Sequence, residues 1–114
     1  MIFYSQKAVE YAVTRCIEKP KYKVLVSIPL SRLKELKRFI KKTKYKQDIG
    51  YRITETSDCL TVRFENGSVI YTVSTAEHTK GRPVHLAILD DNLSRDFIIK
   101  VILPIEVLEI REHS

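Results

Sequence analysis

The chain has 114 residues, of which 44% are hydrophobic, and it carries a net charge of +6 at pH 7. This length fits a single domain over residues 1–114 with a core of its own, and no apolar run approaches the ~20 residues of a membrane span. The two cysteines, Cys16 and Cys59, match no disulfide framework or metal motif. We therefore expect reduced thiols in a cytoplasmic protein.

The first half of the chain predicts two helices around a buried strand. A short strand is expected over 2–4, followed by a helix that Ser5 caps and Pro20 ends, since apolar residues recur between them at helical spacing. Residues 23–28 are apolar without alternation, as in a strand buried on both faces. Ser31 is the expected cap of the second helix. The apolar stripe of that helix consists of Leu33, Leu36, Phe39 and Ile40.

The positive charge of the chain is concentrated on the second helix. Residues 31–46 contain eight basic side chains and one acid, a local charge of +7, so the remainder of the chain carries −1. Such a patch favours an anionic partner, most often nucleic acid, although a solvated helix face has the same composition. The predicted phosphate contacts are Arg32, Lys34, Lys37, Arg38, Lys41 and Lys42, joined by Lys80 and Arg82 from a later loop.

Three runs of β-prone residues, near 51–56, 59–64 and 68–75, predict an antiparallel meander. Asn66-Gly67 favours a two-residue type I′ turn between the last two strands, because both central residues of that turn need positive φ. The pairs predicted across the turn are Phe64 with Val69, Val62 with Tyr71, and Leu60 with Val73.

The first two strands of the meander are expected to place Tyr51 beside Phe64 and, on the opposite face, Arg52 across from Arg63. Like charges directly opposed are unfavourable, so a negative group is expected next to them. We expect Glu65 to supply it, and a phosphate is the alternative.

The last third of the chain begins with a buried strand over 84–89 that ends in Asp90-Asp91, as a parallel strand does when it delivers acids to a site at its carboxyl end. A helix near 92–103 and a strand over 105–110 follow. The whole order predicts a three-layer α/β domain with a partly parallel sheet and an inserted antiparallel β-meander.

Three stretches of the chain carry a resemblance to a known family: VLVSIPLSRLKELKRFI, VRFENGSVIYTVST and KGRPVHLAILDD. Over residues 3–103 they resemble the ATPase domain of large terminase subunits, the viral DNA-packaging motors, and more loosely other helicase-like P-loop ATPases. The resemblance implies a RecA-like P-loop core and a viral or mobile-element origin. It also implies that Asp90, at the position of the Walker B aspartate, holds Mg²⁺.

The phosphate-binding loop of that family is missing from this chain. A P-loop needs Gly-x4-Gly-Lys-[Ser/Thr], whose amides wrap the phosphates, whereas residues 4–7 read Tyr-Ser-Gln-Lys. Lys7 is either a vestige of the phosphate-binding lysine or an exposed side chain of no special role. Asp90 either holds a metal ion or caps the next helix. Asp91 is one methylene shorter than the family's water-activating glutamate, so we expect no catalytic residue and no cofactor.

We therefore expect a small non-catalytic α/β protein of viral or mobile-element origin that binds nucleic acid, or a complex that processes it, through the basic helix. The first alternative is a protein–protein interaction module, such as an inhibitor of a host defence protein. The second is a residual nucleotide-dependent ATPase that uses Lys7 and Asp90.

Overall fold

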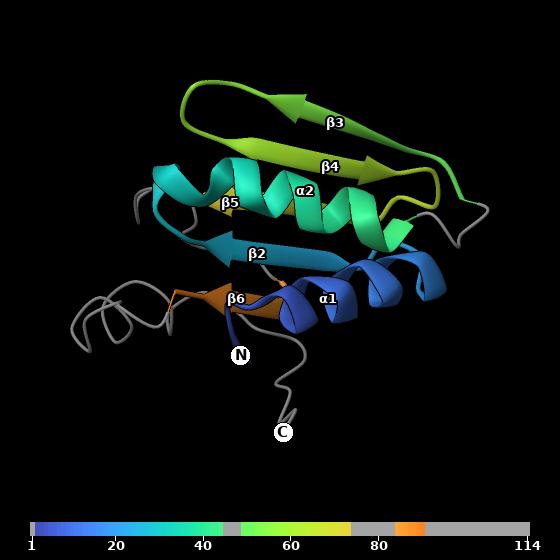
Figure 1. Cartoon of the computed structure of the whole chain (residues 1–114). Coiled ribbons are helices and arrows are strands. Elements are labelled where there is room, and N and C mark those ends of the chain that lie inside the picture. Colours follow the sequence, from blue (N-terminus) through green and yellow to red (C-terminus); the bar gives the residue numbers. More distant parts are fainter. Residues whose placement is uncertain (1, 45–48, 74–83, 91–114) are drawn as a thin grey trace.

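In the computed structural model, which describes residues 2–44, 49–73 and 84–90, two helices lie on one face of a six-stranded sheet (Figure 1). The helices are α1 (Gln6–Glu18) and α2 (Leu33–Lys44), and a short 3-10 turn, η1 (Leu30–Arg32), leads into α2. The strands are β1 (Ile2–Phe3), β2 (Lys23–Ser27), β3 (Tyr51–Glu55), β4 (Leu60–Phe64), β5 (Val69–Val73) and β6 (Leu86–Leu89).

The sheet is mixed, with the order β1-β6-β2-β5-β4-β3. Strands β1, β6, β2 and β5 run parallel to one another, whereas β4 pairs antiparallel with β5 and β3 pairs antiparallel with β4. This confirms an α/β fold with a partly parallel sheet and an antiparallel meander. The helix near 92–103, on which the predicted third layer depends, lies outside the described residues, as does the strand over 105–110.

Helix α1 forms as its sequence predicts. The Oγ of Ser5, whose backbone is extended, accepts a hydrogen bond from the Ala8 N–H at 3.1 Å, and the helix ends before Pro20. The side chains of Val13 and Cys16 are fully buried against the sheet.

Helix α2 begins differently from the prediction. Ser31 lies within η1 and does not cap the helix, because the chain turns directly after the extended residue Pro29. The apolar stripe is confirmed: Leu33, Leu36 and Ile40 are buried, and Phe39 packs against the core while partly exposed. The stripe fixes the orientation of α2 and leaves its cations outside.

The predicted register of the β4–β5 hairpin is wrong by one residue. Val62 pairs with Ile70 and Arg63 with Val69, so Val62 and Ile70 share the core face. Val69 therefore lies on the face of the sheet opposite the helices, together with Arg63.

The error comes from the turn, which has three residues between its closing pair. The Phe64 N–H donates to the Ser68 carbonyl at 2.9 Å, and the Gly67 N–H donates to the Phe64 carbonyl at 3.0 Å. Gly67 has φ of +90°, whereas Asn66 is not in the positive-φ region, so no type I′ turn forms. Asn66 instead donates its side-chain amide to the Cys16 carbonyl at 2.7 Å, which holds the hairpin to the end of α1.

The register predicted for β3 and β4 is confirmed. Tyr51 pairs with Phe64 and Arg52 with Arg63. The two aromatic rings lie 6.1 Å apart between their centroids on the helix-covered side.

Candidate nucleic-acid interface

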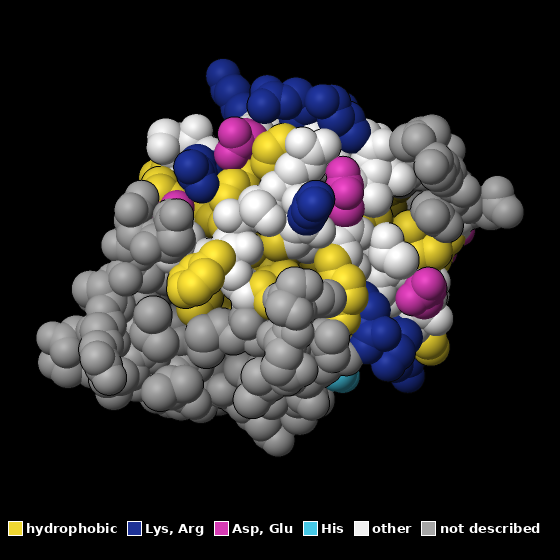
Figure 2. Space-filling view, turned by 60° about the horizontal axis from the view of Figure 1, so that its bottom comes forward, with side chains coloured by type: hydrophobic (Ala, Val, Ile, Leu, Met, Phe, Trp, Pro, Cys, Tyr) yellow, Lys and Arg dark blue, Asp and Glu magenta, His cyan; other side chains and the backbone are white. Residues whose placement is uncertain are grey.

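The outer face of α2 carries a row of five cations, called here the basic row: Lys34, Lys37, Arg38, Lys41 and Lys42. All are exposed except Lys37, which is half-buried, and together they line a shallow hollow of about 380 Å³. Figure 2 shows Lys and Arg side chains gathered along the upper margin of the molecule, where α2 lies. The buried stripe on the opposite side of the helix points the row outward.

Within the described residues, the basic row has one internal counter-charge. The Lys37 ammonium lies 3.0 Å from the Glu55 carboxylate of β3, and the Arg38 guanidinium lies 5.7 Å from the centroid of the Phe39 ring. The remaining lysines of the row form no ion pair in this part of the chain. Lys41 also lies one turn from Lys37, where like charges repel by a few tenths of a kcal/mol. A phosphate backbone would relieve that repulsion.

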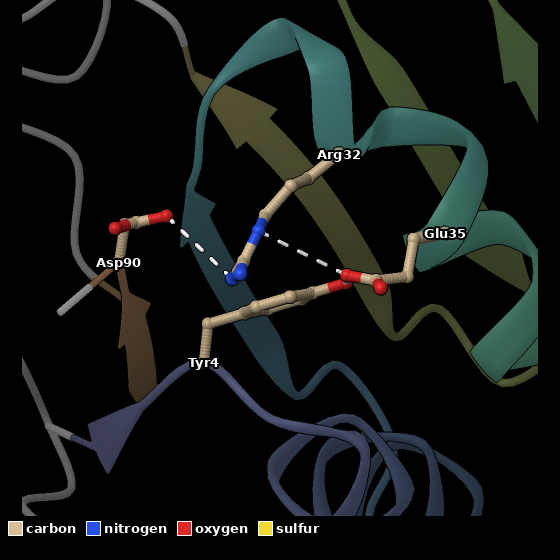
Figure 3. A network of polar contacts seen from close by, with 4 residues as sticks. All are labelled: Tyr4, Arg32, Glu35 and Asp90. Carbon is tan, nitrogen blue, oxygen red and sulfur yellow. Dashed lines mark hydrogen bonds and ion pairs between the residues drawn. The ribbon is translucent and has the colours of Figure 1, made fainter. Parts of the chain in front are cut away.

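Arg32, predicted as a phosphate contact, faces away from the basic row. Its Nη1 lies 3.7 Å from Oδ2 of Asp90, and its Nε lies 4.0 Å from Oε1 of Glu35. The guanidinium also lies over the ring of Tyr4, 5.1 Å from the centroid (Figure 3). Lys80 and Arg82, the other predicted contacts, lie outside the described residues.

These side chains meet because three parallel strands end at the same edge of the sheet. Tyr4 follows β1, Asp90 follows β6, and Arg32 follows β2 through η1. Backbone hydrogen bonds extend the sheet to this edge: the Tyr4 N–H donates to the Leu89 carbonyl at 2.7 Å, and the Asp90 N–H to the Ser27 carbonyl at 2.9 Å. In open α/β sheets this is the edge at which ligands commonly bind.

The described side chains at the carboxyl edge form a network of polar contacts. The Asp90 side chain is 3% exposed and lies beside the Arg32 guanidinium, which is 42% exposed. The Tyr4 hydroxyl donates a hydrogen bond to Glu35 Oε1 at 3.0 Å. Burial, and then that hydrogen bond to a carboxylate, raises the pKa of Tyr4 well above its ordinary value.

Lys7, the predicted vestigial phosphate-binding residue, and Asp90, the predicted metal ligand, lie in different surroundings. Lys7 is exposed in the first turn of α1, and no hydrogen bond or ion pair joins it to Asp90 in the described part of the chain. The cation beside Asp90 is Arg32. Among residues 2–44, 49–73 and 84–90, no group of three or more His, Cys, Asp or Glu side chains is placed to hold a metal ion. A metal at Asp90 therefore stays a prediction.

Sequence reasoning missed Tyr4 and Glu35 as partners of Arg32. The signal available was that Tyr4 is the last residue of one expected strand and Asp90 directly follows another. This signal identifies the site only when β1, β6 and β2 are known to be neighbours, which the sequence alone does not show.

No protein-family model, curated protein or solved structure matches the chain. The resemblance to terminases therefore stays a prediction from the sequence motifs. No helix in the described part of the chain is long and apolar enough to cross a membrane.

Proposed function

We propose that this chain is a small non-catalytic protein that binds nucleic acid, or a complex that processes it, by laying the basic row of α2 against a phosphate backbone. The observation that carries the proposal is the arrangement of the row. Five cations project from one outward helix face, and a single carboxylate of the described residues, that of Glu55, neutralises one of them.

The side chains of the basic row suit a partner that is recognised by its charge and not by its base sequence. Lysine presents a compact ammonium on a long stem, which follows phosphates without fixed geometry. Contacts of this kind position a protein on nucleic acid and carry no sequence information. We further assign Lys80 and Arg82 to the same interface, as their basic loop suggests.

We also propose that the sheet is a P-loop-type core, of viral or mobile-element origin, that lacks the phosphate loop. Three features support this: β1 leads directly into α1, β6 lies next to both β1 and β2 in parallel, and Asp90 directly follows β6. Lys7, at the start of α1, stands where the phosphate-binding lysine of such a core would follow its first strand.

The test is a comparison of charge reversals on the two helices. Lys41→Glu should weaken binding to a labelled duplex DNA and reduce the magnitude of the log–log salt slope by at least ~0.9, the value for one lost phosphate contact. The matched control is Lys7→Glu, which makes the same charge change on α1 and should leave both quantities nearly unchanged. Fluorescence anisotropy, measured at a series of salt concentrations between roughly 50 and 200 mM, gives the affinity and its dependence on salt.

The folding of the variant supplies its own control. Lys41→Glu places an acid one turn after Lys37 but also in the last turn of α2, where the helix dipole disfavours it, so helix stability should change by no more than a few tenths of a kcal/mol. Reduced binding with undiminished stability would therefore come from the interface. Binding that is insensitive to salt, or an equal loss in both variants, would contradict the proposal.

The second candidate function, a protein–protein module, is favoured by two large apolar side chains at the surface. Phe3 is 62% exposed and Leu30 is 49% exposed, and both lie near the carboxyl edge of the sheet. Single exposed apolar residues are common on monomers, however, so the charge of the basic row is the stronger signal.

A further inference from the structure

The face of the sheet opposite α1 and α2, called here the far face, carries a second group of cations. In β4 and β5 the core face is formed by Val62 and Ile70, so alternation turns Arg63 and Tyr71 to the far face. The one-residue difference from the predicted register puts Tyr71 on the same face as Arg63, because Tyr71 pairs with Thr61 and not with Val62.

Three exposed cations converge on this face. Arg52 of β3 pairs directly with Arg63 of β4, and Lys23 of β2 pairs with Val69 of β5, which in turn pairs with Arg63. All three basic side chains are exposed, and none forms an ion pair with another described residue. Like charges directly opposed across a strand pair are unfavourable, so the arrangement favours a bound anion.

The chain's own expected counter-charge is engaged elsewhere. The Glu65 carboxylate accepts the Gly50 N–H at 2.7 Å, which places it on the connection before β3. No ion pair links Glu65 to Arg52 or Arg63 among the residues that the structure describes. Within the described residues the two arginines thus have no ion-pair partner, which is compatible with a bound phosphate.

The far face is also hollowed beside these cations. A hollow of about 660 Å³ is lined by Lys23, Arg63 and Tyr71, with Thr61 and Val69 between them and the hairpin at one end. This is within the usual volume of small-ligand sites, and it combines an aromatic ring, hydroxyl groups and cations. On the same face Leu25 and Leu89 are fully buried, whereas Lys23, Arg52 and Arg63 are exposed.

We propose that this hollow binds single-stranded nucleic acid, with a base against Tyr71 and the adjoining phosphates held by Lys23, Arg52 and Arg63. A single strand is favoured over a duplex because a base must be unstacked from its neighbours to contact an aromatic side chain in a hollow. The proposal shares the ligand class of the proposed function but uses other residues on the other side of the sheet. Each can therefore fail without the other.

The first test removes the opposed arginines. Arg52→Ser/Arg63→Ser should weaken binding of a labelled oligothymidine and reduce the magnitude of its salt slope by ~1.4, since each phosphate contact to a single strand contributes ~0.7. The midpoint of thermal unfolding should stay equal or rise, because a like-charge pair is removed. The matched control, Lys34→Ser/Lys41→Ser, removes two charges from α2. A loss in that control alone would overturn the inference and leave the proposed function standing.

The second test concerns the aromatic ring. Tyr71→Phe keeps a stacking surface and should bind oligothymidine nearly as the parent does, whereas Tyr71→Val keeps a strand-compatible side chain and should bind about tenfold more weakly. Equal affinity of the two variants would contradict base stacking at this residue.

The third test locates the site and separates nucleic acid from other polyanions. In a ¹⁵N-labelled sample, oligothymidine should shift the amides of Thr61, Arg63 and Tyr71, and poly-glutamate at equal charge should bind more weakly. Shifts confined to α2 would overturn the inference alone. Absence of any shift would contradict both proposals. Equal binding of poly-glutamate would show that the site recognises charge and not bases, and would overturn the single-strand assignment.

Discussion

Arg32 illustrates how one side chain at the carboxyl edge can differ from its sequence-based role. Its charge suggested a phosphate contact, but the guanidinium lies beside the buried Asp90 carboxylate and over the Tyr4 ring. It therefore connects η1 to the ends of β1 and β6. An arginine in this place lies beside the acid that the terminase resemblance would assign to Mg²⁺.

The buried thiol of Cys16 and the buried phenol of Tyr4 lead to a prediction about stability at alkaline pH. Burial raises the pKa of the Cys16 thiol above its ordinary value of 9.0, and burial with the Glu35 hydrogen bond raises the pKa of Tyr4 above 10.0. The folded state thus keeps protons that the unfolded chain releases. Stability should be fully present below pH ~9 and fall as pH rises, by at most ~1.4 kcal/mol per pH unit for each group that has begun to titrate in the unfolded chain.

Urea unfolding at a series of pH values measures this loss. In Cys16→Ala the first part of the decline should disappear, so that it begins near pH ~10, where only Tyr4 contributes. A decline that begins at the same pH in parent and variant would show that the thiol does not contribute.

At the scale of elements, Asn66 joins the β4–β5 hairpin to the end of α1. Its amide nitrogen donates to the Cys16 carbonyl at 2.7 Å, and its Oδ1 accepts the Ser68 N–H at 3.0 Å. Ser68 adds a second link, since its hydroxyl donates to the Lys19 carbonyl at 2.6 Å and accepts the Tyr22 N–H at 3.1 Å. Carbonyls left open at a helix end are thus bound by a turn some fifty residues later.

We predict that Asn66→Ala lowers the free energy of unfolding by ~1–2 kcal/mol, because it leaves the helix-end carbonyls and the Ser68 N–H without this partner. Asn66→Asp should not restore stability: it keeps the acceptor for Ser68, loses the donor, and adds a negative charge at a helix C-terminus. Urea denaturation of the three proteins gives the comparison. A stable Asn66→Asp variant would contradict the role of the amide donor.

At the scale of the whole molecule, the two proposed interfaces lie on opposite sides of one sheet. The basic row is on α2, which covers one face, and Arg52, Arg63 and Tyr71 are on the other. A duplex and a single strand could be held at once on this arrangement, because neither site shares a residue with the other.

Thermal stabilisation of the whole chain by ligands distinguishes a nucleic-acid-binding protein from a residual ATPase. A ligand that binds only the native state raises its melting temperature, by a stabilisation of ~4 kcal/mol at a thousand times Kd. We predict no rise with ATP and Mg²⁺, since a phosphate cradle is missing and Arg32 lies beside Asp90. Oligothymidine should raise it and serves as the positive control. A rise with ATP and Mg²⁺ would favour the nucleotide-dependent alternative.

Local patterns in the sequence were sufficient to place most of the elements that the structure describes. Periodic apolar residues placed α1 and the stripe of α2, and β-prone runs placed β2 to β5 within a residue or two, because these signals arise from neighbours in the sequence. The β3–β4 register could also be predicted, including Arg52 opposite Arg63. The basic row followed from the same periodicity, since a helix with one apolar stripe must turn its lysines outward.

Tertiary structure decided what depends on residues far apart in the chain. It set the neighbours of β6, which bring Tyr4, Arg32 and Asp90 to one edge. It also set the hairpin register, because the Asn66 amide hydrogen-bonds to α1 and the turn takes three residues. A hydrogen bond or ion pair between distant segments leaves no periodic trace in the sequence, so only the packed sheet shows which of the described cations have an acid beside them.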